Sequence, residues 1–261
     1  ALQAFHGTAV PVPEPLWCEA EAFGSPGFLM REVAGGAAAG LMTPEPYGDD
    51  AAALGTALFN ALGAIHRTPP EKAGLAPVAA VDAARVRLDH WRQAFEADRF
   101  RPEPIVEAGF RWLDRTPVAP AQRVSVVHSD FRSGNFLHAG PRLLAVLDWE
   151  MVHAGDPLED LAWVCDALWS HGSGRPGALL PKADAIATWE RASGLVCDAE
   201  AFRWWRVFAQ VMGAVIWISS AREVVEGRSH DPVHVFAGLI PYRFPVSYTH
   251  LTLPTSTLCR S

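Results

Sequence analysis

The chain has 261 residues, which is enough for one or two domains. Hydrophobic residues make up 49% of it and charged residues 20%, which excludes a disordered, collagenous or coiled-coil chain. Its 22 basic and 29 acidic residues give a net charge of −7, so we expect neither nucleic acid nor a membrane surface as a partner.

The first predicted element in chain order is a β hairpin. Residues 10–33 contain two apolar runs, which are interrupted by the proline-rich segment 11–15 and by a turn-forming sequence at 24–27. A connector rich in glycine, alanine and proline follows at 34–48. These features predict a small β-rich start of the chain.

A helix is predicted after the connector. Leu54, Leu58, Leu62 and Ile65 recur at helical spacing, which predicts an amphipathic helix that ends near His66.

The rest of the chain is mainly helical. Residues 81–100 and 104–113 have helical patterns, and most of 158–226 does too. Two short β-type runs lie between them, at 124–127 and 143–147. The sequence therefore predicts an α+β fold in which a larger helical body carries a short two-strand insert.

The two ends of the chain have unusual sequences. The chain begins at Ala1 without a charged-then-apolar leader, and we expect an N-terminally truncated fragment. Thr occurs four times in residues 246–261 and six times in all the residues before them. Residues 245–261 resemble a translated sequencing adapter, so we expect a non-native tail; a natural, flexible C-terminus is the alternative.

Several other classes of protein receive no support. The four cysteines are scattered and form no CxxC pair, which favours reduced thiols over a zinc site or a disulfide framework. No stretch is long and apolar enough to cross a bilayer, and we expect a cytoplasmic location. The patterns of serine hydrolases, zinc proteases and P-loop proteins do not occur.

The first chemical motif lies directly after the earlier β-type run. His128, Asp130 and Asn135 stand in the sequence HSDFRSGN, which matches the H-x-D-x-x-x-x-N catalytic loop of phosphoryl-transfer enzymes. This chemistry needs a carboxylate that takes the proton of the acceptor hydroxyl, and an amide oxygen that reaches a Mg²⁺ on the nucleotide phosphates. The alternative is that Asp130 and Asn135 only cap turns.

The second motif lies at the end of the next β-type run. The run ends directly in Asp148, at the start of the sequence DWE, where the kinase pattern places its second metal-binding aspartate. Phosphoryl transfer gathers negative charge around the γ-phosphorus, so two metal-holding groups are needed. We therefore predict that Asn135 and Asp148 hold Mg²⁺; an ordinary residue at the end of a strand is the alternative for Asp148.

Three stretches stand close together in the middle of the chain: HSDFRSGNFL at 128–137, AVLDWE at 145–150 and GDPLEDLA at 155–162. Together they resemble the family of aminoglycoside phosphotransferases and choline kinase-like small-molecule kinases. LGAIH at 62–66 is similar to the helix of that family that ends in His. The finer pattern is similar to the kinase-like domains associated with acyl-CoA dehydrogenases, and the resemblance covers about residues 8–243.

The resemblance implies a protein kinase-like fold. Residues 1–36 would be a remnant of the small β-rich N-lobe with its hinge strand, residues 37–244 the helical C-lobe with the catalytic loop, and residues 245–261 the non-native tail. The resemblance also implies ATP and Mg²⁺ as cofactors, and a small-molecule hydroxyl compound as the acceptor.

The resemblance further implies roles for single residues. Asp130 would be the catalytic base, with Asn135 and Asp148 as Mg²⁺ ligands. His128, counted with the catalytic residues, would brace the loop together with Asp160. Residues 28–33 would be the hinge strand whose backbone contacts adenine; the nucleotide-binding residues there are Met30, Arg31, Glu32 and Val33.

The sequence also departs from the pattern of this family. A kinase-like fold needs a Gly-rich strand pair over the phosphates, and a Lys on the following strand, before the hinge. Neither feature stands before the expected hinge in this sequence. The two lysines, Lys72 and Lys182, both lie downstream of it. We therefore expect that the upstream part of the lobe is missing, and that the fragment binds nucleotide weakly and is inactive.

The acceptor has the weakest signal. Residues 170–244 contain seven acidic residues and a comparable number of basic ones, and this balance does not favour a cationic aminoglycoside as the acceptor. By resemblance, a hydroxyacyl-type metabolite is the better hypothesis. Six tryptophans in the C-terminal helical portion could line an apolar acceptor pocket, although we favour a core role for each of them. They are Trp163, Trp169, Trp189, Trp204, Trp205 and Trp217.

We predict an ATP- and Mg²⁺-dependent phosphotransferase that moves the γ-phosphate to a hydroxyl of a small molecule. The competing hypotheses are a catalytically inactive nucleotide-binding pseudokinase or scaffold, and an aminoglycoside-type antibiotic kinase. The presence of Asp130, Asn135 and Asp148 together argues against a scaffold, which needs none of them.

Overall fold

The computed structural model describes residues 1–22, 25–40 and 43–237. They form two compact units. The first contains Ala1–Ala80 and Ala121–Cys197, and the second contains Val81–Pro120 and Asp198–Ser261, described as far as residue 237. The predicted division of the chain at residue 36 stays a prediction, and the predicted tail lies outside the described residues.

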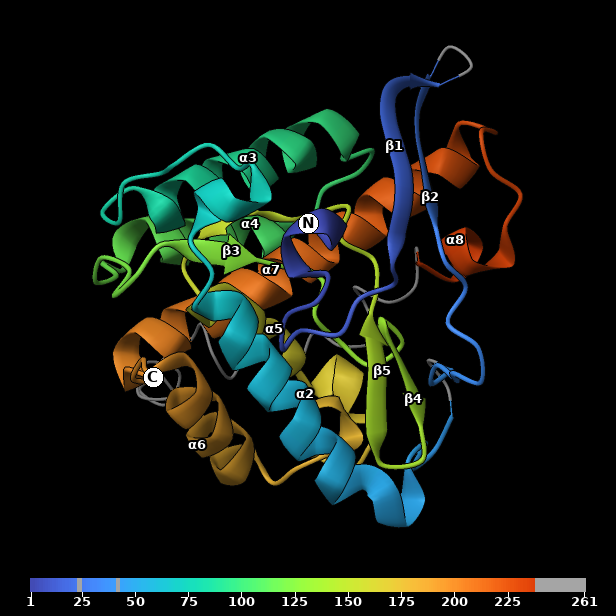
Figure 1. Cartoon of the computed structure of the whole chain (residues 1–261). Coiled ribbons are helices and arrows are strands. Elements are labelled where there is room, and N and C mark those ends of the chain that lie inside the picture. The colour runs from blue at the N-terminus through green and yellow to red at the C-terminus, as the bar shows by residue number, and fades with distance from the viewer. Residues whose placement is uncertain (23–24, 41–42, 238–261) are drawn as a thin grey trace. The chain divides into compact units, whose positions relative to one another are not determined.

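The first unit begins with α1 (Leu2–Phe5) and a hairpin of β1 (Pro15–Ala22) and β2 (Ser25–Met30) (Figure 1). The two strands pair antiparallel, which confirms the predicted hairpin. The predicted turn at 24–27 was wrong in part, because residues 25–27 already belong to β2. Proline and glycine are tolerated there since both strands of a two-stranded sheet are edge strands.

Two helices of the first unit, α2 (Ala51–His66) and α6 (Lys182–Ser193), pack along each other (Figure 1). The four apolar residues that predicted α2 are completely buried, and the helix ends at His66 as predicted. The two backbones approach closely because Gly63 has no side chain: a Cβ there would stand 2.4 Å from the Cβ of Ala192. This contact fixes the end of α2, which carries a residue of the polar network described below.

Four short strands form two further sheets in the first unit, and all pair antiparallel: β3 with β6, and β4 with β5. The predicted two-strand insert was wrong, because each predicted strand pairs with one that the sequence did not indicate. β4 and β6 have four and three residues, too few to show an alternating pattern. The strands are β3 (Ser125–Val127), β4 (Phe136–Ala139), β5 (Arg142–Val146) and β6 (His153–Gly155).

The remaining elements of the first unit are short helices. Every residue of α5 (Leu158–Val164) is buried, including the acidic Glu159 and Asp160, so both carboxylates need polar partners inside the protein. The 3₁₀ helices are η1 (Gly48–Asp50), η2 (Pro70–Ala73), η3 (Ala167–Ser170) and η4 (Pro176–Ala178).

The second unit is helical, and its α3 and α4 both pack against α7. The indole of Trp204 on α7 donates to the carbonyl of Leu113 on α4 at 3.3 Å. Five of the six C-terminal tryptophans in the two units are at most 4% exposed, as the core interpretation predicts, and Trp217 is half-buried. No described helix has the length and apolar character that a membrane crossing requires. The helices of this unit are α3 (Ala83–Asp98), α4 (Pro104–Arg115), α7 (Ala199–Val225) and α8 (Pro232–Ala237).

Candidate active site

The predicted catalytic loop connects β3 with β4, so both of its ends are fixed by strands. Ser129 has a φ of 72°, in the left-handed region that non-glycine residues rarely adopt. The bend at Ser129 leaves the side chain of Asp130 15% exposed, while His128 on the other side of Ser129 is completely buried. The loop therefore presents one carboxylate at its surface.

Three side chains hold the carboxylate of Asp130. The Nε of Arg132 donates to Oδ1 at 3.0 Å and to Oδ2 at 3.1 Å. The indole Nε1 of Trp163 donates to Oδ1 at 2.8 Å, and Nδ2 of Asn135 donates to Oδ2 at 2.6 Å. Charge-assisted bonds of this kind are stronger than neutral ones, so the orientation of Asp130 is well defined before any substrate binds.

Asn135 is oriented by the same contacts. Its Nδ2 also donates to the backbone carbonyl of Asp130 at 2.9 Å, so the side-chain oxygen is turned away from Asp130. The backbone carbonyl of Asn135 accepts from the N–H of Leu147 at 2.8 Å. That bond brings Asp148, the next residue, beside the catalytic loop.

Asp148 has a φ of 62° and an exposed side chain. The neighbouring Trp149 is buried, where it stacks on Phe5 at 4.8 Å and lies 4.5 Å from the ring of His128. Trp149 thus anchors the turn that sends the carboxylate of Asp148 outward.

The donor set fits a magnesium ion. An amide oxygen and a carboxylate are hard oxygen ligands, and Mg²⁺ keeps several waters and takes substrate phosphates as further ligands. Asn135 and Asp148 would be the protein ligands. Among the described residues, no group of three or more His, Cys, Asp or Glu side chains is arranged to hold a metal ion, so we find no rival site of that kind there.

His128 lies behind the loop and has no exposed surface. Its Nε2 donates to the carbonyl of Leu147 at 2.8 Å, and its Nδ1 accepts from the N–H of Asp130 at 3.2 Å. This pattern requires the neutral ring, and burial lowers the pKa of His128, which favours the same form. His128 therefore holds the loop to the segment before Asp148, and its place among the catalytic residues stays a prediction.

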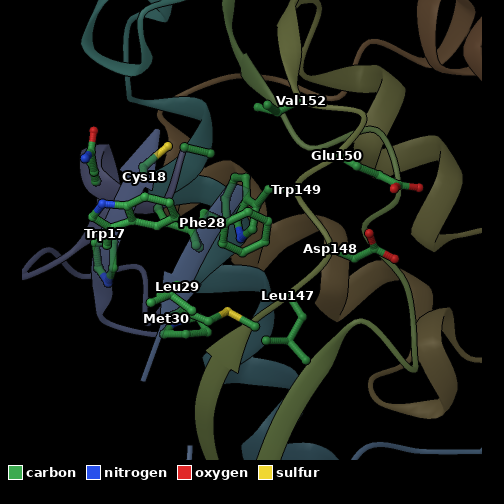
Figure 2. Close-up of a pocket in the computed structure, with 15 residues that line it drawn as sticks. Trp17, Cys18, Phe28, Leu29, Met30, Leu147, Asp148, Trp149, Glu150 and Val152 are labelled. Carbon is green, nitrogen blue, oxygen red and sulfur yellow. The ribbon is translucent and has the colours of Figure 1, made fainter. Parts of the chain in front are cut away.

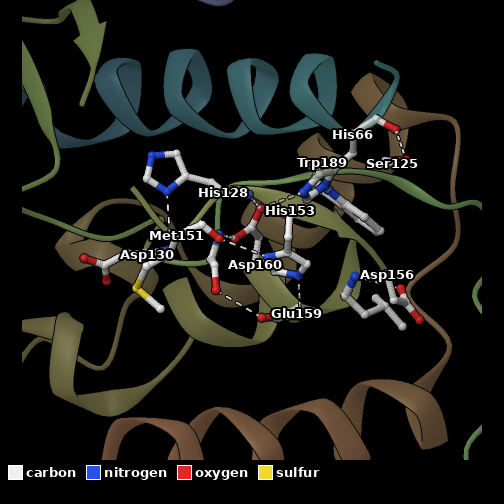
Figure 3. A network of polar contacts seen from close by, with 12 residues as sticks. His66, Ser125, His128, Asp130, Met151, His153, Asp156, Glu159, Asp160 and Trp189 are labelled. Carbon is white, nitrogen blue, oxygen red and sulfur yellow. Dashed lines mark hydrogen bonds and ion pairs between the residues drawn. The ribbon is translucent and has the colours of Figure 1, made fainter. Parts of the chain in front are cut away.

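Asp160 holds the loop from below (Figure 3). Its Oδ2 accepts from the N–H of His128 at 2.8 Å, and its Oδ1 accepts from the N–H of Ser129 at 2.7 Å. His66, at the end of α2, donates from Nε2 to Oδ2 at 3.0 Å, while its Nδ1 accepts from the indole of Trp189 at 2.8 Å. A chain of buried hydrogen bonds thus runs from α6 through α2 to the catalytic loop.

A cavity of about 460 Å³ lies between the hairpin and the segment that carries Asp148 (Figure 2). Asp148 and Glu150 are among the lining residues, and the wall is mainly apolar. The cavity thus adjoins Asp148, one of the predicted metal ligands. Its other principal side chains are Trp17, Phe28, Leu29, Met30, Leu147 and Trp149.

The predicted nucleotide-binding residues divide into two groups. Met30 lines the cavity and ends β2. The prediction of a hinge strand over 28–33 was wrong in its extent, because Arg31, Glu32 and Val33 continue as irregular chain. The N–H of Arg31 still bonds to the carbonyl of Glu14, and its side chain pairs with the Glu14 carboxylate, so Arg31 stays attached to the segment before β1.

The sequence did not indicate Arg132 as part of this site, and it indicated Trp163 and Trp189 as core residues or as the wall of an acceptor pocket, not as donors to Asp130 and His66. Arg132 stands two residues after Asp130, and this spacing was the one local signal available for it. The indoles of Trp163 and Trp189 come from helices far along the chain, so no local pattern identifies their partners.

Residues 1–195 match the family described as the phosphotransferase enzyme family (APH). The Gallus gallus protein named acyl-CoA dehydrogenase family member 11 is 28% identical over 166 residues, which is 62% of this chain and 21% of that protein. This chain thus spans about a fifth of the length of that curated relative. The family resemblance of the central motifs is confirmed.

Solved structures show the same fold. A Ralstonia eutropha JMP134 protein, whose description names an aminoglycoside phosphotransferase, aligns with a TM-score of 0.78 at 20% identity, over 96% of this chain and 80% of that one. The aminoglycoside phosphotransferase APH(4)-Ia, in a ternary complex with ADP and hygromycin B, aligns with a TM-score of 0.59 at 17% identity, over 97% and 81%. The predicted protein kinase-like fold is confirmed.

Proposed function

Because this chain belongs to the phosphotransferase enzyme family, we propose that it is the catalytic part of an ATP- and Mg²⁺-dependent kinase for a small hydroxyl compound. The observation that carries the proposal is the arrangement around Asp130. The carboxylate of Asp130 is held by three donors, and one of them is the amide of Asn135. The backbone hydrogen bond between Asn135 and Leu147 brings the carboxylate-bearing Asp148 to the same loop.

In the proposed reaction, Asp130 accepts the proton of the acceptor hydroxyl and orients its oxygen. That oxygen forms a bond to the γ-phosphorus, the bond from phosphorus to the β,γ-bridging oxygen breaks, and ADP leaves. A Mg²⁺ held by Asn135 and Asp148 would offset the negative charge on the phosphates. Arg132 stays paired with Asp130 while the acceptor approaches, and so limits its orientation.

We place the nucleotide base in the apolar cavity, with Met30 in its wall and the backbone of Arg31, Glu32 and Val33 beside it. The bound ADP of APH(4)-Ia supports nucleotide use by this family. Neither lysine lies in the hairpin, since Lys72 is in η2 and Lys182 begins α6. We therefore expect weak nucleotide binding and slow but measurable turnover by this chain at high MgATP.

As acceptor we propose a hydroxyacyl-type metabolite, because the Gallus gallus relative carries a name from acyl-CoA chemistry. The pairing of Asp130 with Arg132 also leaves no unbalanced negative charge at the catalytic carboxylate for a cationic aminoglycoside. Hygromycin B, which is bound in APH(4)-Ia, is the reference acceptor for the antibiotic alternative.

The test is a phosphotransfer assay on the purified chain at high MgATP, with hydroxyacyl-CoA compounds, simple hydroxy acids and hygromycin B as acceptors. Asp130→Asn keeps the shape of the side chain but removes the base, so we expect kcat to fall about 10²- to 10⁴-fold with little change in the KM for MgATP. Asp184→Asn, an exposed change on α6, is the matched control.

Two results would contradict this proposal. An unchanged kcat in Asp130→Asn would remove the base assignment. A thermal shift with MgATP, but no phosphorylated product from any acceptor, would favour an inactive nucleotide-binding protein.

A further inference from the structure

Ser129 connects the catalytic loop to a buried carboxylate that the proposed reaction does not use. Its Oγ donates to Oε1 of Glu159 at 3.1 Å, and Glu159 is 1% exposed. Ser129 directly precedes Asp130 and holds the left-handed backbone conformation that turns the loop. Because a serine rarely adopts this conformation, a bond that fixes its side chain also stabilises the turn.

The other oxygen of Glu159 faces a histidine. Oε2 lies 3.2 Å from Nε2 of His153, and Nδ1 of the same ring lies 3.1 Å from the carbonyl of Met151 (Figure 3). A carboxylate accepts hydrogen bonds, so the ring nitrogen that faces Glu159 is the donor of this contact. The His153 ring thus supplies a polar partner to a carboxylate that is almost completely buried.

The strand pairing ties His153 to the loop by a second route. His153 begins β6 and stands directly opposite Val127, the last residue before the catalytic loop. A Cβ on Gly155 would lie 2.9 Å from Nε2 of His153 and 3.3 Å from Cγ2 of Val127, so the ring packs tightly against the backbone here. A change at His153 thus reaches the loop through the sheet and through Glu159.

Other titratable groups surround the pair, and each has contacts of its own. They bond to backbone N–H groups, to backbone carbonyls or to one another. Glu159 is the carboxylate that bonds to the His153 ring in the described network. The surrounding groups are Asp156 and Asp160 at α5, His128 and Asp130 in the loop, and His66 at the end of α2.

Resting on the kinase function above, we propose that Glu159 and His153 are positioning residues for phosphoryl transfer. The His153 ring fixes Glu159, and Glu159 fixes Ser129 in the conformation that aims Asp130. Removal of either contact should therefore lower the rate of phosphoryl transfer and leave nucleotide binding unchanged.

The experiment measures kcat and the KM for MgATP of the full chain and of two Glu159 variants. The side chain of Glu159→Gln can accept from Ser129 and still hydrogen-bond to the ring nitrogen, so we expect this variant to keep most of kcat. Glu159→Ala should lower kcat roughly 10- to 100-fold, with the KM for MgATP unchanged.

His138→Gln is the matched control. His138 also lies on a strand, and its Nδ1 contacts a carbonyl two residues away, that of Gly140. No carboxylate is bonded to this ring within the described part of the chain. Its substitution should leave kcat unchanged, whereas His153→Ala should lower kcat as Glu159→Ala does.

The outcomes separate this inference from the function on which it rests. An unchanged kcat in Glu159→Ala overturns the inference, and so does an equal loss of kcat in Glu159→Ala and Glu159→Gln. If no acceptor is phosphorylated, urea denaturation of Glu159→Ala, His153→Ala and the double variant still decides it. Losses of stability that are not additive in the double variant would support the contact while the proposed function fails, and additive losses would overturn the inference.

Discussion

The indole N–H of Trp163 donates to Oδ1 of Asp130 at 2.8 Å across 33 residues of sequence. Trp163 lies on the completely buried helix α5, so its ring cannot follow movements of the loop. The carboxylate that we assign as catalytic base is therefore oriented by a residue of the hydrophobic core as well as by its own loop.

Trp163→Phe should lower kcat about tenfold, with the KM for MgATP nearly unchanged, because the ring is kept while the donor to Asp130 is lost. The measurement is steady-state kinetics of phosphotransfer. Trp169→Phe is the control: its Nε1 is buried and has no hydrogen-bond partner in the described part of the chain, and it lies 5.1 Å from Trp163. Equal losses in both variants would mean that packing, not the hydrogen bond, is responsible.

Asp148→Asn should raise the Mg²⁺ concentration for half-maximal activity at least about tenfold, because it replaces a charged oxygen ligand with a neutral one. A Mg²⁺ titration of the transfer rate at fixed ATP measures this, and chelation of Mg²⁺ should abolish the rate. Glu150→Gln, two residues away and also exposed, is the control. The ligand assignment is wrong if the two variants shift the Mg²⁺ requirement equally.

The stability of the protein should depend on pH through His128. Burial lowers its pKa from the ordinary value of 6.5, so below about pH 6.5 the unfolded chain binds a proton that the folded chain does not. The free energy of unfolding then decreases as the pH falls from 6.5 toward the lowered pKa, by at most about 1.4 kcal/mol per pH unit.

Urea denaturation of the unmodified chain and of His128→Gln over this pH range tests the prediction. Glutamine can donate to the carbonyl of Leu147, as Nε2 of His128 does, but it does not titrate. The variant should be less stable overall and should lose part of the acid sensitivity. The same pH dependence in both proteins would assign that sensitivity to other groups.

Gly63→Ala should destabilise the first unit by roughly 1 to 3 kcal/mol, because the added methyl group overpacks the contact between α2 and α6 near Ala192. Chemical denaturation measures the loss. Thr56→Ala on the exposed face of α2 is the control and should change stability little. An unchanged stability in Gly63→Ala would show that the helices can move apart without cost.

The sequence alone determined the family resemblance, the candidate catalytic motifs and most of the helices. The spacing from His128 to Asn135 is a local pattern, and so is the position of Asp148 at the end of the second predicted β-type run. Such patterns can be recognised in the sequence because a short loop between strands fixes the order and separation of its residues. Helical periodicity likewise placed α2 and its end at His66, since every residue of a helix repeats the same local geometry.

Tertiary structure alone decided which side chains meet. His66 reaches Asp160 across 94 residues and Trp189 reaches His66 across 123, and no periodicity links such positions. The pairing of β3 with β6 also needed the folded chain, because a three-residue strand carries too few residues to show which neighbour it will take. Local rules fix the identity and spacing of the reacting groups, but their orientation depends on contacts between distant segments that form only when the core packs.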